Sequence, residues 1–333
     1  MINRLLHRLP GLALVVATAL AGLAAGPAAH AQERWPARPI RIVVPFAPGG
    51  SADAAARFLA PKLAERLGQQ VIVENRPGAG GTLAVGQVAK AAAPDGYTLL
   101  LAAAGALTIS PHLVEGLNYE PLKDLAPVTG FARIPLVLIA NAGVPAGTPA
   151  QLIELLRRQP GRFSYATTGN GSAMHLGGES FKSVTGTYIV HIPYRGSAPA
   201  VSAVMSGEVE LGIVDLTSVI GRTDTSRFKT LALLGKERSS LAPSLPTLSE
   251  SGVPGFDVSG WFGLFAPVKV DAAIVQRLNA EITALLRSDE MRERFRQIGV
   301  EAMPTSPQQL GEFLRAESGN FAAVIRRARI QAN

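Results

Sequence analysis

Short β-branched runs alternate with segments of helical periodicity, and this alternation constrains the fold more than any other feature of the chain. Ile40–Val44 is typical of a buried strand, and the helix expected after it begins near Ser51 and ends at Gly68. Further strands are expected at residues 71–73 and 97–101, with a second helix between them. This β-α-β-α-β order predicts an α/β fold with a mainly parallel sheet flanked by helices.

A second unit of the same kind begins after Gly130, and a chain of 333 residues usually forms two domains. Strands near residues 231–234 and 261–266 then carry the chain back, and helices close it. We therefore expect two lobes and two crossings between them, near residues 129–133 and 236–241. The expected division is residues 1–31 as a signal peptide, 32–132 plus 240–333 as lobe I, and 133–239 as lobe II.

The N-terminus has the pattern of a secretory signal peptide. Arg4 and Arg8 precede an uncharged apolar run at residues 12–25, and Ala29-His30-Ala31 has the small-x-small form of a cleavage site. A run this short favours cleavage over an uncleaved membrane anchor, because a bilayer span needs about 20 residues. We predict an exported, soluble protein that is cleaved after Ala31.

Composition excludes several classes of function. The chain has no Cys, which rules out disulfides, thiol nucleophiles and Cys-bound metals. The net charge of +7 falls to +5 when Arg4 and Arg8 are removed with the signal peptide, and the basic residues that remain are scattered rather than paired with aromatics. We expect no nucleic-acid partner, no metal and no cofactor, since the phosphate-loop and dinucleotide motifs are absent as well.

An enzymatic reading has little support. No G-x-S-x-G elbow is present. A triad of Ser172, His175 and Asp215 is conceivable, but His175 lies only three residues after Ser172 on the same expected helix. We therefore expect His175 to order the turn before that helix, and we predict that the protein is not an enzyme.

Two Gly-rich turns resemble each other, and each lies between a strand and a helix. Free backbone amides at a helix N-terminus bind anions, and glycine lets a ligand approach the backbone closely. Ordinary helix capping is the alternative for either turn alone, but a matched pair, one in each lobe, favours a shared carboxylate site. The candidate residues are Ala47, Pro48, Gly49, Gly50, Ser51 and Asp53 in the first turn, Thr168, Gly169, Asn170, Gly171 and Ser172 in the second, and His175 on the helix that follows the second.

Asp215 is a further candidate, because it ends an apolar strand near the expected site. Its carboxylate could bind a ligand ammonium group or cap the next turn, and the sequence does not decide between the two.

The chain resembles substrate-binding proteins of the tripartite tricarboxylate transporter family, the Bug or TctC-like group, over essentially its whole mature length. The segments that carry the resemblance are 45–53 (PFAPGGSAD), 74–81 (ENRPGAGG), 94–100 (PDGYTLL), 169–172 (GNGS) with 175–176 (HL), 191–196 (HIPYRG), and 254–256 (PGF) before 261–263 (WFG). The resemblance implies a two-lobed periplasmic-binding-protein (Venus-flytrap) fold. It also implies capture of a small carboxylate in the periplasm and delivery to a membrane permease.

The resemblance also implies roles for particular loops. The first strand–helix loop and the Gly-rich loop of lobe II would clamp the carboxylate, largely through backbone amides, hydroxyls and water. The family often has polar side chains after its third strand, where this chain has Ala104 and Gly105, so any contact there would come from the backbone. A monomeric transport receptor is the expected form, and a periplasmic sensor subunit that acts with a two-component signalling partner is the alternative.

Overall fold

The structure is a computed structural model that describes residues 35–220, 222, 225–328 and 330. Its contacts divide the chain into Met1–Ala37 and Arg38–Asn333, and the description below concerns the second unit. The predicted signal peptide and its cleavage site lie outside the described residues. Within the described ranges, no helix combines the length and the apolar character needed to cross a membrane.

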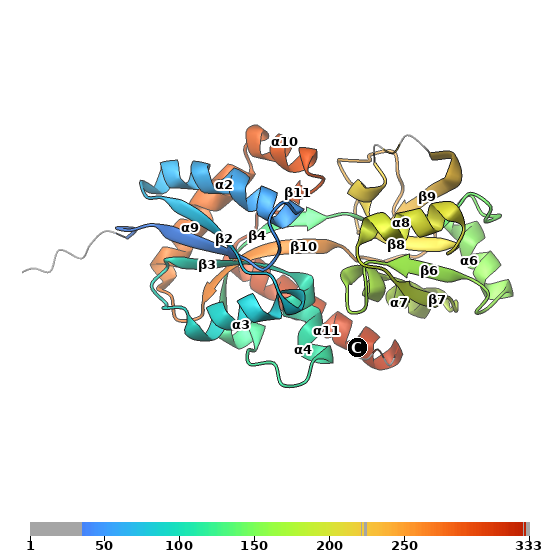
Figure 1. The fold of residues 1–333 in the computed structure, drawn as a ribbon, viewed down its shortest axis with the longest axis horizontal. Coiled ribbons are helices and arrows are strands. Elements are labelled where there is room, and N and C mark those ends of the chain that lie inside the picture. The colour runs from blue at the N-terminus through green and yellow to red at the C-terminus, as the bar shows by residue number, and fades with distance from the viewer. Residues whose placement is uncertain (1–34, 221, 223–224, 329, 331–333) are drawn as a thin grey trace, which may run out of the picture. The chain divides into compact units, whose positions relative to one another are not determined.

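The first sheet has six strands in the order β11-β4-β10-β3-β1-β2 (Figure 1). Its strands are β1 (Ile40–Val44), β2 (Val71–Asn75), β3 (Thr98–Ala103), β4 (Leu125–Ile134), β10 (Gly260–Pro267) and β11 (Glu301–Ala302). The helices and helical turns that accompany it are α2 (Ser51–Leu67), η1 (Ala79–Gly81), α3 (Thr82–Ala91), η2 (Gly105–Ile109), α4 (Ser110–Leu113), α5 (Pro121–Asp124), α9 (Ala272–Leu286), α10 (Asp289–Gln297) and α11 (Pro307–Ala328). We call this assembly lobe I.

The second sheet has five strands in the order β7-β6-β8-β5-β9. Its strands are β5 (Leu136–Asn141), β6 (Ser164–Thr167), β7 (Val190–Pro193), β8 (Leu211–Asp215) and β9 (Phe228–Leu233). Its helices and turns are α6 (Pro149–Arg158), α7 (Ala173–Thr185), α8 (Ser197–Ser206), η3 (Leu216–Ser218) and η4 (Thr225–Arg227). We call this assembly lobe II.

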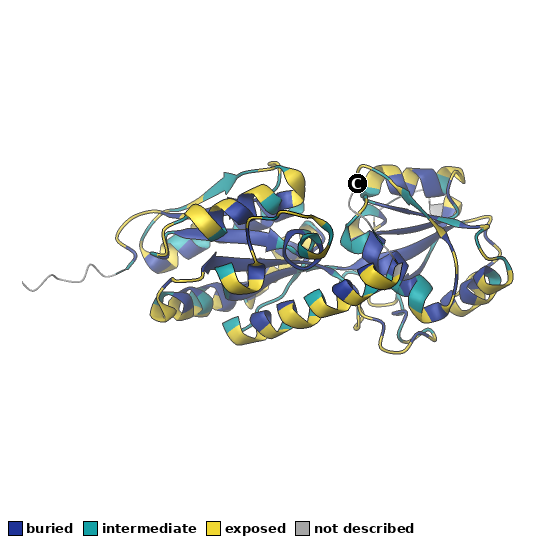
Figure 2. Ribbon diagram, turned by 90° about the horizontal axis from the view of Figure 1, so that it is seen from below, coloured by how far each residue is buried: buried dark blue, intermediate teal, exposed yellow. Residues whose placement is uncertain are grey.

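Both sheets are mixed rather than mainly parallel. In lobe I, β1 pairs in parallel with β2 and β3, but β10 inserts antiparallel between β3 and β4. In lobe II, β6 pairs in parallel with β7 and β8, but β5 is antiparallel to both β8 and β9. The strands that run against the others are β10 and β11 in lobe I and β5 in lobe II, and β5 and β10 each directly follow a crossing between the lobes. Figure 2 shows the sheets buried beneath helices whose outer faces are exposed, as expected for two separate cores.

The chain crosses from lobe I to lobe II at Pro135, between β4 and β5. The return crossing lies near Ser259 instead of residues 236–241, so the expected assignment of 240–259 to lobe I needs correction. Within that segment Leu248, Val253, Phe256 and Val258 all belong to the core of the second sheet. The Val258 amide also donates to Leu234 O at 2.8 Å, so burial and hydrogen bonding together hold this irregular connection on lobe II.

Helix α11 contacts both lobes. Its first half packs on the sheet of lobe I through Leu310 and Leu314. Its second half packs on lobe II through Phe321 and Ile325, which form a cluster with Ile109 of η2 and Leu176 of α7.

Midway along α11, Glu317 joins this helix to two other elements of lobe I. Trp261 Nε1 donates to both oxygens of the Glu317 carboxylate, at 2.7 and 2.8 Å, and Thr108 Oγ1 donates to Glu317 Oε2 at 2.9 Å. These bonds connect α11 to β10 and to the π-helical turn η2.

Candidate functional site

The turn between β1 and α2 presents the N-terminus of α2 without a side-chain cap. Gly50 is the N-cap residue, with extended φ and ψ of −80° and 170°, and no side chain accepts from the first helical amides. Ser51 is the first helical residue rather than the N-cap, and its hydroxyl has no hydrogen-bond partner in the described part of the chain. An uncapped helix N-terminus leaves several amide donors free for a ligand.

The Asp53 side chain stabilises this turn through hydrogen bonds. The buried carboxylate accepts from the Gly49 amide at 2.9 Å, from Asn75 Nδ2 at 2.9 Å and from Arg57 Nε at 3.0 Å. Burial opposes ionisation of Asp53, but the bonds from Arg57, Gly49 and Asn75 outweigh it and hold the pKa of the carboxyl below its ordinary value. Asp53 is therefore a charged support for the turn, with Arg57 as its counterion.

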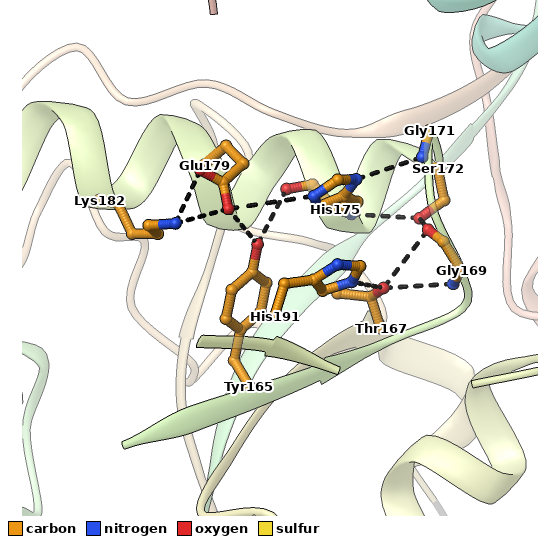
Figure 3. A network of polar contacts seen from close by, with 9 residues as sticks. All are labelled: Tyr165, Thr167, Gly169, Gly171, Ser172, His175, Glu179, Lys182 and His191. Carbon is orange, nitrogen blue, oxygen red and sulfur yellow. Dashed lines mark hydrogen bonds and ion pairs between the residues drawn. The ribbon is translucent and has the colours of Figure 1, made fainter. Parts of the chain in front are cut away.

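The second turn uses most of its polar groups within lobe II (Figure 3). Ser172 caps α7: its hydroxyl accepts from the His175 amide at 3.1 Å and donates to Gly169 O at 2.7 Å. The Gly171 amide donates to His175 Nδ1 at 3.2 Å. The Gly169 amide donates to Thr167 Oγ1 at 3.2 Å. His175 thus orders the turn, as the sequence predicted.

A buried polar network lies behind this turn. The imidazoles of His175 and His191 stack with centroids 3.9 Å apart, and His191 Nε2 lies 2.7 Å from Thr167 Oγ1. Tyr165 and Lys182 both donate to Glu179, at 2.8 Å. Burial lowers the pKa of both imidazoles, that of His191 to about 3, so the pair is neutral at neutral pH. The network stabilises the base of the turn without carrying a positive charge on its imidazoles.

Ser172→Ala is expected to lower the free energy of unfolding by about 1 kcal/mol, because an N-cap hydroxyl contributes roughly 0.5–2 kcal/mol. Ser51→Ala is the matched control, since the Ser51 hydroxyl has no partner in the described part of the chain and its loss should leave stability nearly unchanged. Urea denaturation of the two ligand-free variants measures the difference. Equal stabilities would contradict the capping role of Ser172.

A cavity of about 420 Å³ connects the first turn to residues of lobe II. Gly49, Gly50 and Ser51 line it from lobe I, and Asp215 lines it from the end of β8 in lobe II. The structure therefore brings together four of the candidate residues from opposite lobes. The other residues in its lining, which the sequence did not single out, are Ala54, Ile134, Met174, Thr217, Ile298, Gly299 and Val300.

The remaining candidates lie outside this lining. Ala47 and Pro48 are exposed in the first turn, and Ala104 and Gly105 lie at the start of η2, beside Thr108. In the second turn, Thr168 Oγ1 donates to Met174 Sδ at 3.3 Å, so Thr168 reaches the cavity only through Met174. Asn170 is exposed, and a Cβ at Gly171 would lie 3.4 Å from Leu113 of lobe I.

Three of the lining residues that the sequence did not single out, Ile298, Gly299 and Val300, directly follow α10. Gly299 has a φ of +70°, and a Cβ built there would lie 1.5 Å from Thr217 Cγ2. This contact brings lobe I against lobe II at the cavity wall. A glycine after a helix end is an ordinary C-terminal signal, so the local pattern carried no sign of the contact.

No cluster of three or more His, Asp or Glu side chains suited to a metal ion occurs in the described ranges.

The model of the tripartite tricarboxylate transporter family receptor, TctC, matches residues 55–330. The chain belongs to the TctC family. Among its relatives, protein BugT of Bordetella pertussis is 39% identical over 309 residues, covering 92% of this chain and 94% of the relative.

Solved structures agree with this assignment. R. palustris Rpa4515, solved with adipate, has a TM-score of 0.74 and 35% identity, and covers 89% of this chain and 99% of its own. MatC (Rpa3494) from Rhodopseudomonas palustris, solved with bound malate, has a TM-score of 0.70 and 30% identity, and covers 87% of this chain and 100% of its own. The two-lobed architecture is therefore that of a TctC solute-binding protein.

Proposed function

We propose that the protein captures a small carboxylate between its two lobes in the periplasm and delivers it to the membrane subunits of a tripartite tricarboxylate transporter. The observation that carries the proposal is the cavity in which the uncapped N-terminus of α2 meets residues of lobe II. We further propose that the chain is exported with cleavage after Ala31 and acts as a monomer. N-terminal sequencing and sedimentation of the exported protein test these two points.

The chemistry of the cavity favours an anion held by backbone amides. No Lys or Arg is among the described residues that line it, so neutral donors must bind the carboxylate. The N-terminal amides of α2 and its dipole favour negative charge, and the Ser51 hydroxyl adds a donor. The adipate and malate bound by the two relatives are small carboxylates, which supports the same ligand class here.

A thermal-shift screen of mono-, di- and tricarboxylates, followed by calorimetry, tests the proposal. A ligand at 100 times its Kd adds about 2.7 kcal/mol to the free energy of unfolding. Absence of any shift across the three classes would contradict carboxylate capture.

Gly50→Val is expected to weaken the best ligand of this screen at least tenfold. The extended backbone at Gly50 accepts a side chain, and a Cβ there meets only Ala47 O, at 3.9 Å, so the variant should fold. The branched side chain would then occupy the mouth of the amide turn and block close approach of the carboxylate. Calorimetry on the folded variant measures the loss, and Arg294→Ala, an exposed change outside the cavity, is the control. Normal binding by Gly50→Val would place the anion elsewhere.

A further inference from the structure

Asp215 has one carboxylate oxygen in use and one without a partner among the described residues. Thr217 Oγ1 donates to Asp215 Oδ1 at 2.5 Å, and the Ser218 amide donates to the same oxygen at 2.9 Å. Oδ2 receives no hydrogen bond from the described residues, and none of their ion pairs includes Asp215. The capping role that the sequence left open is therefore fulfilled by one oxygen, and the second oxygen is available to another group.

The surroundings of Asp215 in the cavity supply no positive charge from the described residues. The lining contains neither Lys nor Arg, and much of the wall is apolar, from Ile134, Met174, Ile298 and Val300. Asp215 is half-buried at the end of β8. A cationic group on a ligand would therefore pair with the free Oδ2 of Asp215 without competition from a protein cation in this lining.

We propose that the ligand is a carboxylate that also carries an ammonium group, with its carboxylate at the N-terminus of α2 and its ammonium group at Asp215 Oδ2. This inference rests on the proposed function, and it narrows the ligand class. A dicarboxylate of equal length would place its second negative charge beside Asp215, and that repulsion selects against it. The two ends of the cavity thus have opposite electrostatic character, which a zwitterion matches and a dianion does not.

Calorimetry on the mature full-length protein with matched ligand pairs tests this inference. The probes are β-alanine with malonate, γ-aminobutyrate with succinate, and δ-aminovalerate with glutarate, so that each pair keeps its carbon count and differs at one end. We expect the amino acid of at least one pair to bind ten times more tightly than its dicarboxylate. In Asp215→Asn that ratio should fall at least tenfold, because asparagine keeps a capping oxygen but loses the charge.

Asp271→Asn is the matched control. Asp271 is also an N-cap residue, accepting from the Ala273 amide at 2.8 Å, but it does not line the cavity, so the ratio should stay unchanged. Three results would overturn the inference: a ratio that survives in Asp215→Asn, a wild-type preference for the dicarboxylates, or binding of another carboxylate from the screen but of neither probe series. In each of these cases the proposed function stands. The wild-type ratio needs no variant and so does not depend on the folding of Asp215→Asn.

Discussion

Gly299→Ala is expected to weaken ligand binding by about a hundredfold. The new Cβ would lie 1.5 Å from Thr217 Cγ2 and 2.7 Å from Thr217 Cβ, which no rotation of the threonine can relieve fully. Overpacking of this kind costs roughly 1–3 kcal/mol, and every 1.4 kcal/mol is about tenfold in affinity. Because Gly299 and Thr217 belong to different lobes and both line the cavity, the alanine must push the two walls apart.

Two further variants separate this clash from backbone strain. Gly68 has a φ of +71°, nearly that of Gly299, but nothing lies within 4 Å of a Cβ there. Gly68→Ala therefore introduces the strain of an alanine in the left-handed region without a steric clash. Thr217→Gly added to Gly299→Ala removes every Thr217 side-chain atom near the new Cβ and should restore much of the affinity. Calorimetry with the best carboxylate of the screen measures the affinity of all three variants. Equal binding by Gly299→Ala and Gly68→Ala would show that the approach of the lobes at this point is unimportant.

Between pH 4 and pH 8, the free energy of unfolding of Glu317→Gln is expected to rise by about 3 kcal/mol relative to that of the wild type. Burial, reinforced by the charge of Asp257, raises the pKa of Glu317 from 4.5 to about 7, against the lowering effect of the bonds from Trp261 and Thr108. A shift of this size corresponds to about 1.4 kcal/mol for each pKa unit.

The sign follows from which state binds the proton. Below pH 4.5 the Glu317 carboxyl is protonated in both the folded and the unfolded chain, so the stabilisation from its raised pKa is fully present. Between pH 4.5 and about 7 the unfolded chain releases the proton while the folded protein keeps it, so the free energy of unfolding falls as the pH rises. Above about pH 7 this stabilisation is lost.

Glutamine stays neutral and can still accept from Trp261, so the variant should lack this decline. Urea denaturation of both proteins at pH 4 and pH 8 should show that Glu317→Gln gains stability relative to the wild type as the pH rises. Effects common to both proteins, such as protonation of the His175–His191 pair at low pH, cancel in this comparison. Glu312→Gln, an exposed change on the same helix, is the control. A constant difference between wild type and Glu317→Gln would contradict a raised pKa.

Local patterns predicted most of the regular elements. Thr148 caps α6 by accepting from the Gln151 amide, and Ser306 and Gln309 form a capping box before α11. These signals succeed because each is satisfied by residues within one turn of the chain. Strand β4 was not predicted, because Pro127 and Gly130 interrupt its pattern. The register shifts of β10 opposite them show that the pairing accommodates both residues through bulges.

The candidate site was predictable only in part, because only some of its residues have a signature within their own stretch of the chain. The turn from Gly49 to Ser51 and the strand end at Asp215 have local signatures, and both line the cavity. The contribution of residues 298–300 depends on their approach to Thr217, more than eighty residues earlier in the chain. The second Gly-rich turn shows the converse: its local pattern is typical of an anion site, but its Ser172 hydroxyl and three of its amides bond within lobe II. The sequence pattern could not show whether the backbone amides of a Gly-rich turn are free or already hydrogen-bonded within the lobe.

The two anchor points of α11 restrict how the lobes can rotate. The helix has 22 residues, or about 33 Å at 1.5 Å per residue, and it is held on lobe I by Leu314 and on lobe II by Phe321. A helix held by both of its halves permits rotation about its own axis but resists bending across it. A motion that keeps both contacts is therefore a twist of one lobe about α11, and a hinge opening perpendicular to the helix must first detach one of the two halves.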